Sequence, residues 1–150
     1  MANLASTYQS QGRLDEAEKL FVQVIEAQET KLGVDHPDTL TSMASLASTF
    51  WNQGRLDEAE KLGVQVIEAQ ETKLGVDHPD TLTSMANLAS TYGNQGRLDE
   101  AEKLGVRVME VSKAKLGVDH PNTLTSIGNL ASTFWNQGRL DEAEKLFIQH

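Results

Sequence analysis

One segment of 42 residues recurs along the 150-residue chain, and this repeat limits the possible folds more strongly than composition does. Two strings mark the repeat, QGRLDEAEKL and LGVDHP. They begin at Gln11, Gln53, Gln95 and Gln137, and at Leu32, Leu74 and Leu116. Residues 1–42 and 43–84 are identical at 37 of 42 positions. Each unit of such a chain can bury its apolar face only against neighbouring units, so we expect a core that extends along the array.

Within one unit, apolar residues recur at intervals of three and four, which is the period of one helix face. In residues 37–75 two such sets occur: Leu40, Met43, Leu46, Ala47 and Phe50, then Ala59, Leu62, Val66, Ala69 and Leu74. Gly54 separates the two sets, and a glycine just past a helix is typical of a left-handed C-cap. The pattern therefore predicts two antiparallel helices of about 16 and about 19 residues, joined by a tight glycine turn.

Polar residues at the helix starts predict the caps. Pro79 fits the first position of a helix, with Asp77 or His78 as the N-cap. At the start of the second helix, Asp57 is the expected N-cap, with Glu60 three residues later. The acidic cluster LDEAE recurs at every such start, so we interpret it as capping and solvation and not as a pair of catalytic carboxylates.

The sequence offers no arrangement suited to catalysis. His36, His78 and His120 are equivalent residues of successive units, which stack at helix-packing distances of about 8–10 Å or more. Zinc ligands lie about 2 Å from the metal, so these histidines cannot share one ion. The sequence has no cysteine and no distinguished nucleophile and base. We expect no enzyme activity, no cofactor and no metal site.

Charge and hydropathy limit the partners. A net charge of −9 argues against nucleic acid, because affinity for its phosphates depends largely on clustered Lys and Arg. No apolar run approaches the roughly 20 residues of a membrane span, and no signal peptide is visible. We therefore expect a soluble, cytoplasmic protein that binds neither nucleic acid nor membrane.

The positions that recur from unit to unit resemble the tetratricopeptide repeat, whose signature combines a large residue, Leu, a small residue, an aromatic, a turn Gly and a later Ala. Here these are Met85, Leu88, Ala89, Tyr92, Gly96 and Ala101. The 42-residue length is similar to the variety found in kinesin light chains. The resemblance implies an all-α fold, an α-solenoid in which antiparallel helix pairs stack into a right-handed superhelix. It covers residues 1–150 as one domain fragment, with units 1–42, 43–84 and 85–126 and the partial unit 127–150.

The resemblance also implies a function, a protein–protein interaction scaffold that presents a concave groove to a peptide or protein segment. The first helix of each pair lines the groove. By motif phase its groove-facing positions are Thr83, Ala86, Asn87, Ser90, Gly93 and Asn94. This face is neutral, small and polar. The basic residues with which family members hold chaperone carboxylates or acidic peptides are not present on it.

Candidate peptide-binding residues are Asn3, Gln9, Trp51, Asn52, Asn87, Ser90, Asn94, Asn129, Trp135 and Asn136. Asn3, Asn87 and Asn129 match a family asparagine that binds peptide backbone, since a side-chain amide both donates and accepts hydrogen bonds. Trp51 and Trp135 occupy a position that varies among the units, and tryptophan is enriched in binding hot spots. The alternative for these residues is packing between adjacent helices.

The rival function is a structural spacer or a self-associating array within a larger multidomain protein, with no peptide ligand. Neither end has a polar capping helix, so we expect a piece of a longer array whose apolar end, including Leu146, Phe147 and Ile148, associates head to tail. Gly63 and Gly105 lie in the middle of second helices, where glycine costs about 1 kcal/mol relative to alanine. Close approach of another helix would compensate for that cost.

Overall fold

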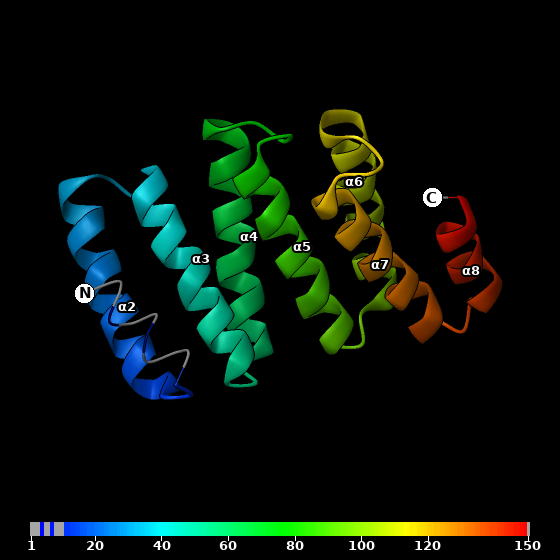
Figure 1. Cartoon of the computed structure of the whole chain (residues 1–150). Coiled ribbons are helices and arrows are strands. Elements are labelled where there is room, and N and C mark those ends of the chain that lie inside the picture. Colours follow the sequence, from blue (N-terminus) through cyan, green and yellow to red (C-terminus); the bar gives the residue numbers. More distant parts are fainter. Residues whose placement is uncertain (1–3, 5–6, 8–10, 150) are drawn as a thin grey trace. The chain divides into compact units, whose positions relative to one another are not determined.

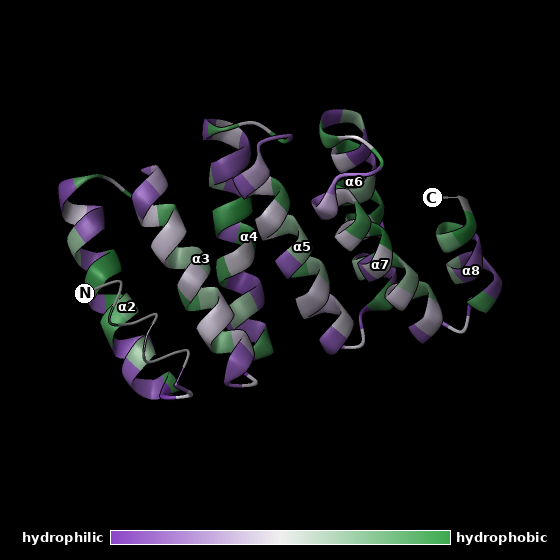
Figure 2. Ribbon diagram, in the orientation of Figure 1, coloured by the Kyte–Doolittle hydropathy of each residue, from purple (hydrophilic) through white to green (hydrophobic). Residues whose placement is uncertain are grey.

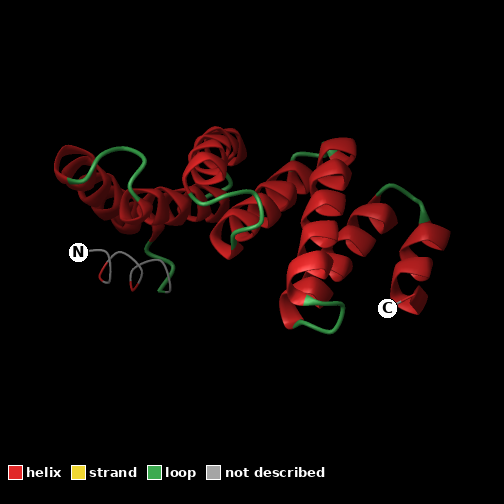
Figure 3. Ribbon diagram, turned by 90° about the horizontal axis from the view of Figure 1, so that it is seen from above, coloured by secondary structure: helices red, strands yellow, loops and turns green. Residues whose placement is uncertain are grey.

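The computed structural model describes residue 4, residue 7 and residues 11–149, and within these ranges it contains helices and no strand (Figure 3). The helices are α2 (Leu14–Lys31), α3 (Pro37–Asn52), α4 (Leu56–Lys73), α5 (Pro79–Asn94), α6 (Leu98–Leu116), α7 (Pro121–Asn136) and α8 (Leu140–Gln149) (Figure 1). Helices α3, α5 and α7 have 16 residues each, while α4 has 18 and α6 has 19. The predicted all-α fold and the predicted alternation of helix lengths are confirmed.

The helices form two compact units, Met1–Val76 and Asp77–His150. In the first unit α2 packs against α3, and α3 packs against α4. In the second unit each consecutive pair from α5 to α8 is packed together, and α5 also contacts α7. No described helix is both long enough and apolar enough to pass through a membrane.

Each unit buries the apolar faces that the sequence predicts. The core of the first unit consists of Ala17, Phe21, Ile25, Leu40, Met43, Leu46 and Val66. The core of the second unit consists of Met109, Ile127, Leu130, Ala131, Phe134, Ala143 and Leu146. Figure 2 shows apolar and hydrophilic residues on the same helices, as expected for helices that bury one face.

The turn between α3 and α4 has the predicted left-handed glycine. Gly54 has a φ of +79°, a conformation that a side chain disfavours. The Arg55 N–H donates to the Phe50 carbonyl at 2.9 Å and closes the turn. Helix α4 then begins at once, at Leu56.

The caps follow the prediction at one kind of helix start and contradict it at the other. The Nδ1 atom of His36 accepts a hydrogen bond from the Asp38 N–H at 3.1 Å, and His78 and His120 cap α5 and α7 in the same way. The predicted N-cap Asp57 is wrong, because Arg55 occupies the N-cap position without a side-chain cap. Asp57 lies in the first turn instead, where negative charge is favoured by the helix dipole.

Arg55 connects the glycine turn to the preceding helix. Its guanidinium lies 4.5 Å from the centroid of the Phe50 ring and donates to Glu58 at 2.9 Å and to Glu18 of α2 at 2.7 Å. These hydrogen bonds, that to Glu58 foremost, raise the pKa of Arg55, and Arg55 lowers the pKa of Glu58.

Arg139 repeats this arrangement in the second unit. It lies 4.5 Å from the centroid of the Phe134 ring, donates to Glu102 of α6 at 2.6 Å and pairs with Glu142. Each arginine therefore holds its turn against the second helix of the preceding repeat, which is α2 for Arg55 and α6 for Arg139.

Gly105 shows the close approach expected for a glycine inside the second helix. A Cβ atom added to this residue would lie 3.3 Å from Cδ1 of Leu130 on α7. This is tighter than ordinary contact, and the surrounding side chain Leu130 is 1% exposed. The absence of a side chain at residue 105 lets α6 and α7 pack closely.

Candidate functional site

A groove of about 230 Å³ lies in the second unit, between α5 and α7, with α6 below them. Its lining residues are Pro79, Leu82, Thr83, Ala86, Asn87, Ser90, Val108, Ser112, Leu116, Asn122, Thr125, Ser126 and Asn129. The two first helices of successive repeats thus form the walls, and the second helix between them contributes the floor.

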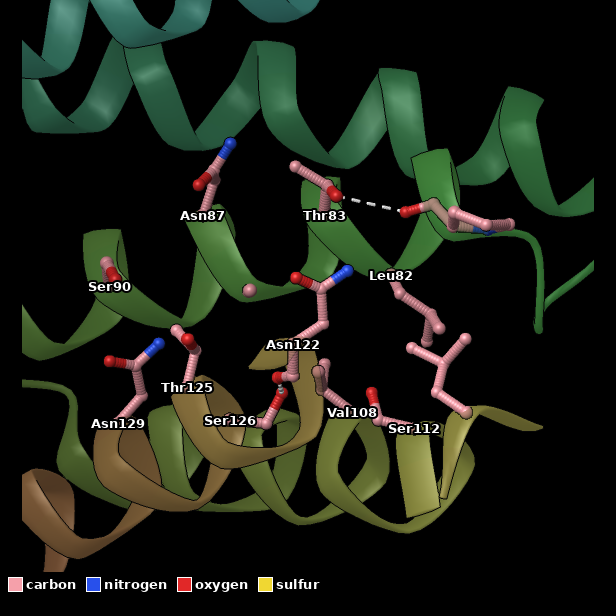
Figure 4. A pocket seen from close by; sticks show the side chains of 13 residues that line it. Leu82, Thr83, Asn87, Ser90, Val108, Ser112, Asn122, Thr125, Ser126 and Asn129 are labelled. Carbon is pink, nitrogen blue, oxygen red and sulfur yellow. Dashed lines mark hydrogen bonds between the residues drawn. The ribbon is translucent and has the colours of Figure 1, made fainter. Parts of the chain in front are cut away.

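The two ends of this groove differ in polarity. Figure 4 shows Asn87, Ser90 and Asn129 at one end and Leu82, Val108 and Ser112 at the other. Leu82 is 6% exposed and Val108 is 4% exposed, so the apolar end reaches down to the core. A bound chain would meet hydrogen-bonding groups at one end of the groove and apolar carbon at the other.

The threonine hydroxyl groups on the groove walls have local partners. Thr83 donates to the Pro79 carbonyl and Thr125 to the Pro121 carbonyl, each at 3.0 Å. A hydroxyl that donates to its own helix keeps its oxygen lone pairs available. These side chains therefore offer acceptors to a ligand.

The side-chain amides in the groove offer both donors and acceptors. Within residues 11–149, the amides of Asn87, Asn122 and Asn129 have no hydrogen-bond partner, and all three residues are exposed. One amide can donate two hydrogen bonds and accept through its oxygen. The groove can therefore pair with a ligand that presents N–H and C=O groups together.

The groove carries no formal charge, because its 13 lining residues include no Asp, Glu, Lys, Arg or His. Lys115, which adjoins the lining residue Leu116, pairs with Asp77 at 3.1 Å, and this pairing lowers the pKa of Asp77. An ionised ligand group would find no counter-charge among the residues of the groove, so a neutral ligand is favoured.

The structure brings together three of the candidate residues. Asn87, Ser90 and Asn129 line the groove. Asn94 and Asn136 are exposed at the ends of α5 and α7 but do not line it, and Trp51 and Asn52 are exposed at the end of α3 in the first unit. Asn3 and Gln9 lie outside the described residues.

Trp135 faces a different direction from the groove. At about 100° per residue, it is rotated by about 120° around α7 from Asn129. Its side chain is 65% exposed. The asparagines and this indole therefore belong to two separate surfaces of α7.

Sequence reasoning did not find the floor of the groove. Motif phase identifies outward positions of a first helix, but it does not tell which residues of the second helix reach between two first helices. Val108 and Ser112 come from α6, and Asn122 comes from the first turn of α7. The sequence does contain a signal for two of them, since Ser112 and Asn122 replace Gln70 and Asp80 of the preceding repeat.

A second hollow, of about 620 Å³, lies in the first unit and is formed by residues 12–16 with Gln53 and Arg55. Its polar groups are largely engaged with one another. Gln53 donates to Asp15 and to Glu18, each at 3.1 Å, and Arg55 is bound to Glu18 and Glu58. This hollow is therefore a weaker candidate than the α5–α7 groove.

Known proteins share this repeat and this fold. A tetratricopeptide repeat family model matches residues 1–72, 45–114 and 80–150. The crystal structure of a Podosopora anserina protein described as kinesin light chain-like, with nearly identical TPR-like repeats, is similar at 34% identity. That match has a TM-score of 0.91 and covers 99% of this chain and 70% of that one. A single-residue variant of the same protein matches equally well.

A more distant structure, BtubC from P. vanneervenii, has the same fold at 18% identity, with a TM-score of 0.89 over 97% of this chain and 58% of that one. A search of curated proteins finds no match. The family model extends over both compact units and over every complete 42-residue repeat. The chain therefore belongs to the tetratricopeptide repeat family.

Proposed function

We propose that the chain is a protein-interaction module that holds an extended, uncharged polypeptide segment in the α5–α7 groove. The observation that carries this proposal is the set of three amides, on Asn87, Asn122 and Asn129, that line one uncharged groove without partners among the described residues. Every residue of an extended segment presents backbone N–H and C=O groups, and side-chain amides complement both.

The groove is smaller than an ordinary small-molecule pocket. Its volume of about 230 Å³ is below the range of about 300–1,000 Å³ that is usual for such pockets. The groove also lies between parallel walls contributed by two repeats. Membership of a family built around protein interaction agrees with a polypeptide ligand.

The other candidate residues are proposed as contacts outside the groove. Trp135 is 65% exposed and Trp51 is 38% exposed, and the residues that follow them, Asn136 and Asn52, are exposed too. Asn94 is exposed at the end of α5. A partner larger than a short peptide offers surface for contacts beyond the groove residues. Trp51→Ala and Trp135→Ala are then expected to weaken binding of a protein partner more than binding of a hexapeptide.

A library of end-blocked hexapeptides tests the proposal, with affinities measured by calorimetry. Saturable binding is expected, and the double variant Asn87→Ala with Asn129→Ala should weaken it about tenfold or more, since two hydrogen bonds are lost. Gln65→Ala, at an exposed position of α4, is the control and should bind as the wild type does. The absence of saturable binding across the library would refute the proposal.

One observation favours self-association as a second function. Phe147 of α8 is 65% exposed, whereas Phe21, the equivalent residue of the first repeat, is 1% exposed beneath α3 and α4. Ile148 is 73% exposed next to it. Burial of this apolar face by a second copy of the chain would reproduce the packing seen around Phe21. Sedimentation velocity over a range of concentrations tests this function, and a clean monomer at high micromolar concentration excludes it.

A further inference from the structure

One floor position of the α5–α7 groove differs from its counterparts in the other repeats. Ser112 of α6 is equivalent to Gln28 of α2 and Gln70 of α4, each 42 residues apart. Gln70 is 4% exposed and Ser112 is 2% exposed, so this position is buried in both helices. The Oε1 atoms of Gln28 and Gln70 are buried without a hydrogen-bond partner among the described residues. The position is thus occupied by a long polar side chain in two repeats and by a short one in the third.

The short side chain opens the apolar end of the groove. Ser112 lines the groove together with Leu82, Val108 and Leu116, and Figure 4 shows it beside Val108. A glutamine side chain has three more heavy atoms than a serine side chain and reaches two atoms further, and at this position its amide would enter the space between these apolar residues. The serine leaves that space to a ligand.

A second exchange removes charge from the same groove. Asn122 replaces the acidic residues Asp38 and Asp80 of the preceding repeats. The change is part of a wider shift, since residues 85–126 hold five basic and five acidic side chains while residues 43–84 hold three and seven. A carboxylate at residue 122 would have to lose water when a peptide covered it, so the asparagine favours neutral occupants.

We infer that Ser112 and Asn122 make this groove a selective site, in which an uncharged extended segment places one Val-, Ile- or Leu-sized side chain between Leu82, Val108 and Leu116. This inference rests on the proposed function and specifies its ligand class. The asparagines bind the backbone of the segment, Ser112 provides the room for its side chain, and Asn122 keeps the groove neutral.

The test uses end-blocked hexapeptides of Ser, Gly and Asn in which one position is Leu, Val, Gly, Asp or Lys. The wild type should bind the Leu peptide at least tenfold more tightly than the Gly and Asp peptides. Ser112→Gln should remove most of this preference, because the glutamine fills the space that the Leu side chain needs. Asn122→Asp should weaken the neutral peptides and favour the Lys peptide.

The control variant is Ala114→Thr, which also restores the residue of the earlier repeats. Residue 114 is exposed on α6 and does not line the groove, so this variant should keep the wild-type preference. Circular dichroism verifies that each variant is folded. All three substitutions introduce residues that the chain already carries at equivalent positions, which limits the risk of misfolding.

The outcomes separate the inference from the function on which it rests. Binding that depends on Asn87 but shows no preference for Leu over Gly in the wild type overturns the inference alone. A preference that survives unchanged in folded Ser112→Gln does the same. If no hexapeptide binds saturably, or if Asn87→Ala has no effect on binding, the proposed function fails and the inference fails with it.

Discussion

At the scale of single residues, three glycines of the second unit have three different roles. Gly96 ends the turn after α5 with a φ of +80°. Gly93 lies within α5, and a Cβ atom there would meet nothing within 4 Å. Gly105 faces Leu130, where a Cβ atom would be 3.3 Å from its Cδ1. The effect of a side chain therefore depends on backbone conformation at Gly96, on open space at Gly93 and on helix packing at Gly105.

Two alanine substitutions three residues apart should have opposite effects on stability. Gly96→Ala should lower the free energy of unfolding by about 1–2 kcal/mol, because a side chain disfavours the left-handed conformation. Gly93→Ala should raise it by about 0.5–1 kcal/mol, because alanine favours the helix and the site is open. Urea unfolding measures both. Equal effects from the two substitutions would contradict the conformational assignment of Gly96.

At the scale of elements, the arginine that follows each glycine turn, Arg55 or Arg139, holds successive helices together. Arg139 contacts Phe134 at the end of α7, Glu142 at the start of α8 and Glu102 of α6, so one side chain joins three helices. Arg55 does the same for α2, α3 and α4. A planar guanidinium suits this role, since it can stack on a ring and bind two carboxylates at once.

Substitution of Arg139 should therefore loosen α8. Arg139→Ala should lower the thermal unfolding midpoint of the chain, and Arg139→Lys should lower it as well but to a smaller extent, because lysine keeps the charge and loses the planar geometry. Hydrogen exchange should show the largest increase in α8. Equal stability of the wild type and Arg139→Lys would show that the planar geometry is unimportant.

The glutamates that pair with these arginines should make the stability of the fold depend on pH. Hydrogen bonds from arginine lower the pKa values of Glu58, Glu100 and Glu142. A carboxyl whose pKa is lower in the folded state stabilises the fold at pH values above its ordinary pKa of about 4.3, and this contribution is lost as the pH falls through the folded value. Urea midpoints should thus decline below about pH 4. The decline should be smaller in Arg139→Ala, and an identical decline would contradict the role of Glu142.

The sequence predicts the elements better than it predicts the site. Helical periodicity, Pro79 and the turn glycines are local signals, and they placed α3 to α5 nearly as observed. The N-cap Asp57 was predicted wrongly because the closure of the turn at Arg55 starts the helix earlier than the acidic cluster suggests. The groove floor could not be predicted from periodicity, since Val108 and Ser112 become groove residues only when α5 and α7 are placed on either side of α6.

At the scale of the whole molecule, the two compact units contain the same repeat but differ in their functional surfaces. The second unit contains the uncharged groove, and it also carries the exposed face of Phe147 and Ile148 on α8. In the first unit the hollow near Arg55 is lined by charged groups that have ion-pair partners, Arg13 with Glu16 and Arg55 with Glu18. The two units therefore share one fold, and a few exchanged residues account for the differences between their surfaces.

The exposed face of α8 gives a prediction about assembly. Phe147→Glu should abolish concentration-dependent association, because a carboxylate cannot be buried cheaply in the place of an apolar ring. Gln65→Glu adds the same charge at an exposed position of α4 and should leave association unchanged. Sedimentation velocity compares the two variants with the wild type. Association that persists in Phe147→Glu would place the contact elsewhere on the chain.

The most direct test of the central claim, that the α5–α7 groove binds an extended neutral segment, is a map of backbone amide chemical shifts during titration with the tightest-binding hexapeptide. We expect the largest changes along α5 and α7, at Asn87, Thr125 and Asn129, and at Ser112 on α6, with no change around Phe147. Changes confined to α8, or spread evenly over both units, would contradict it.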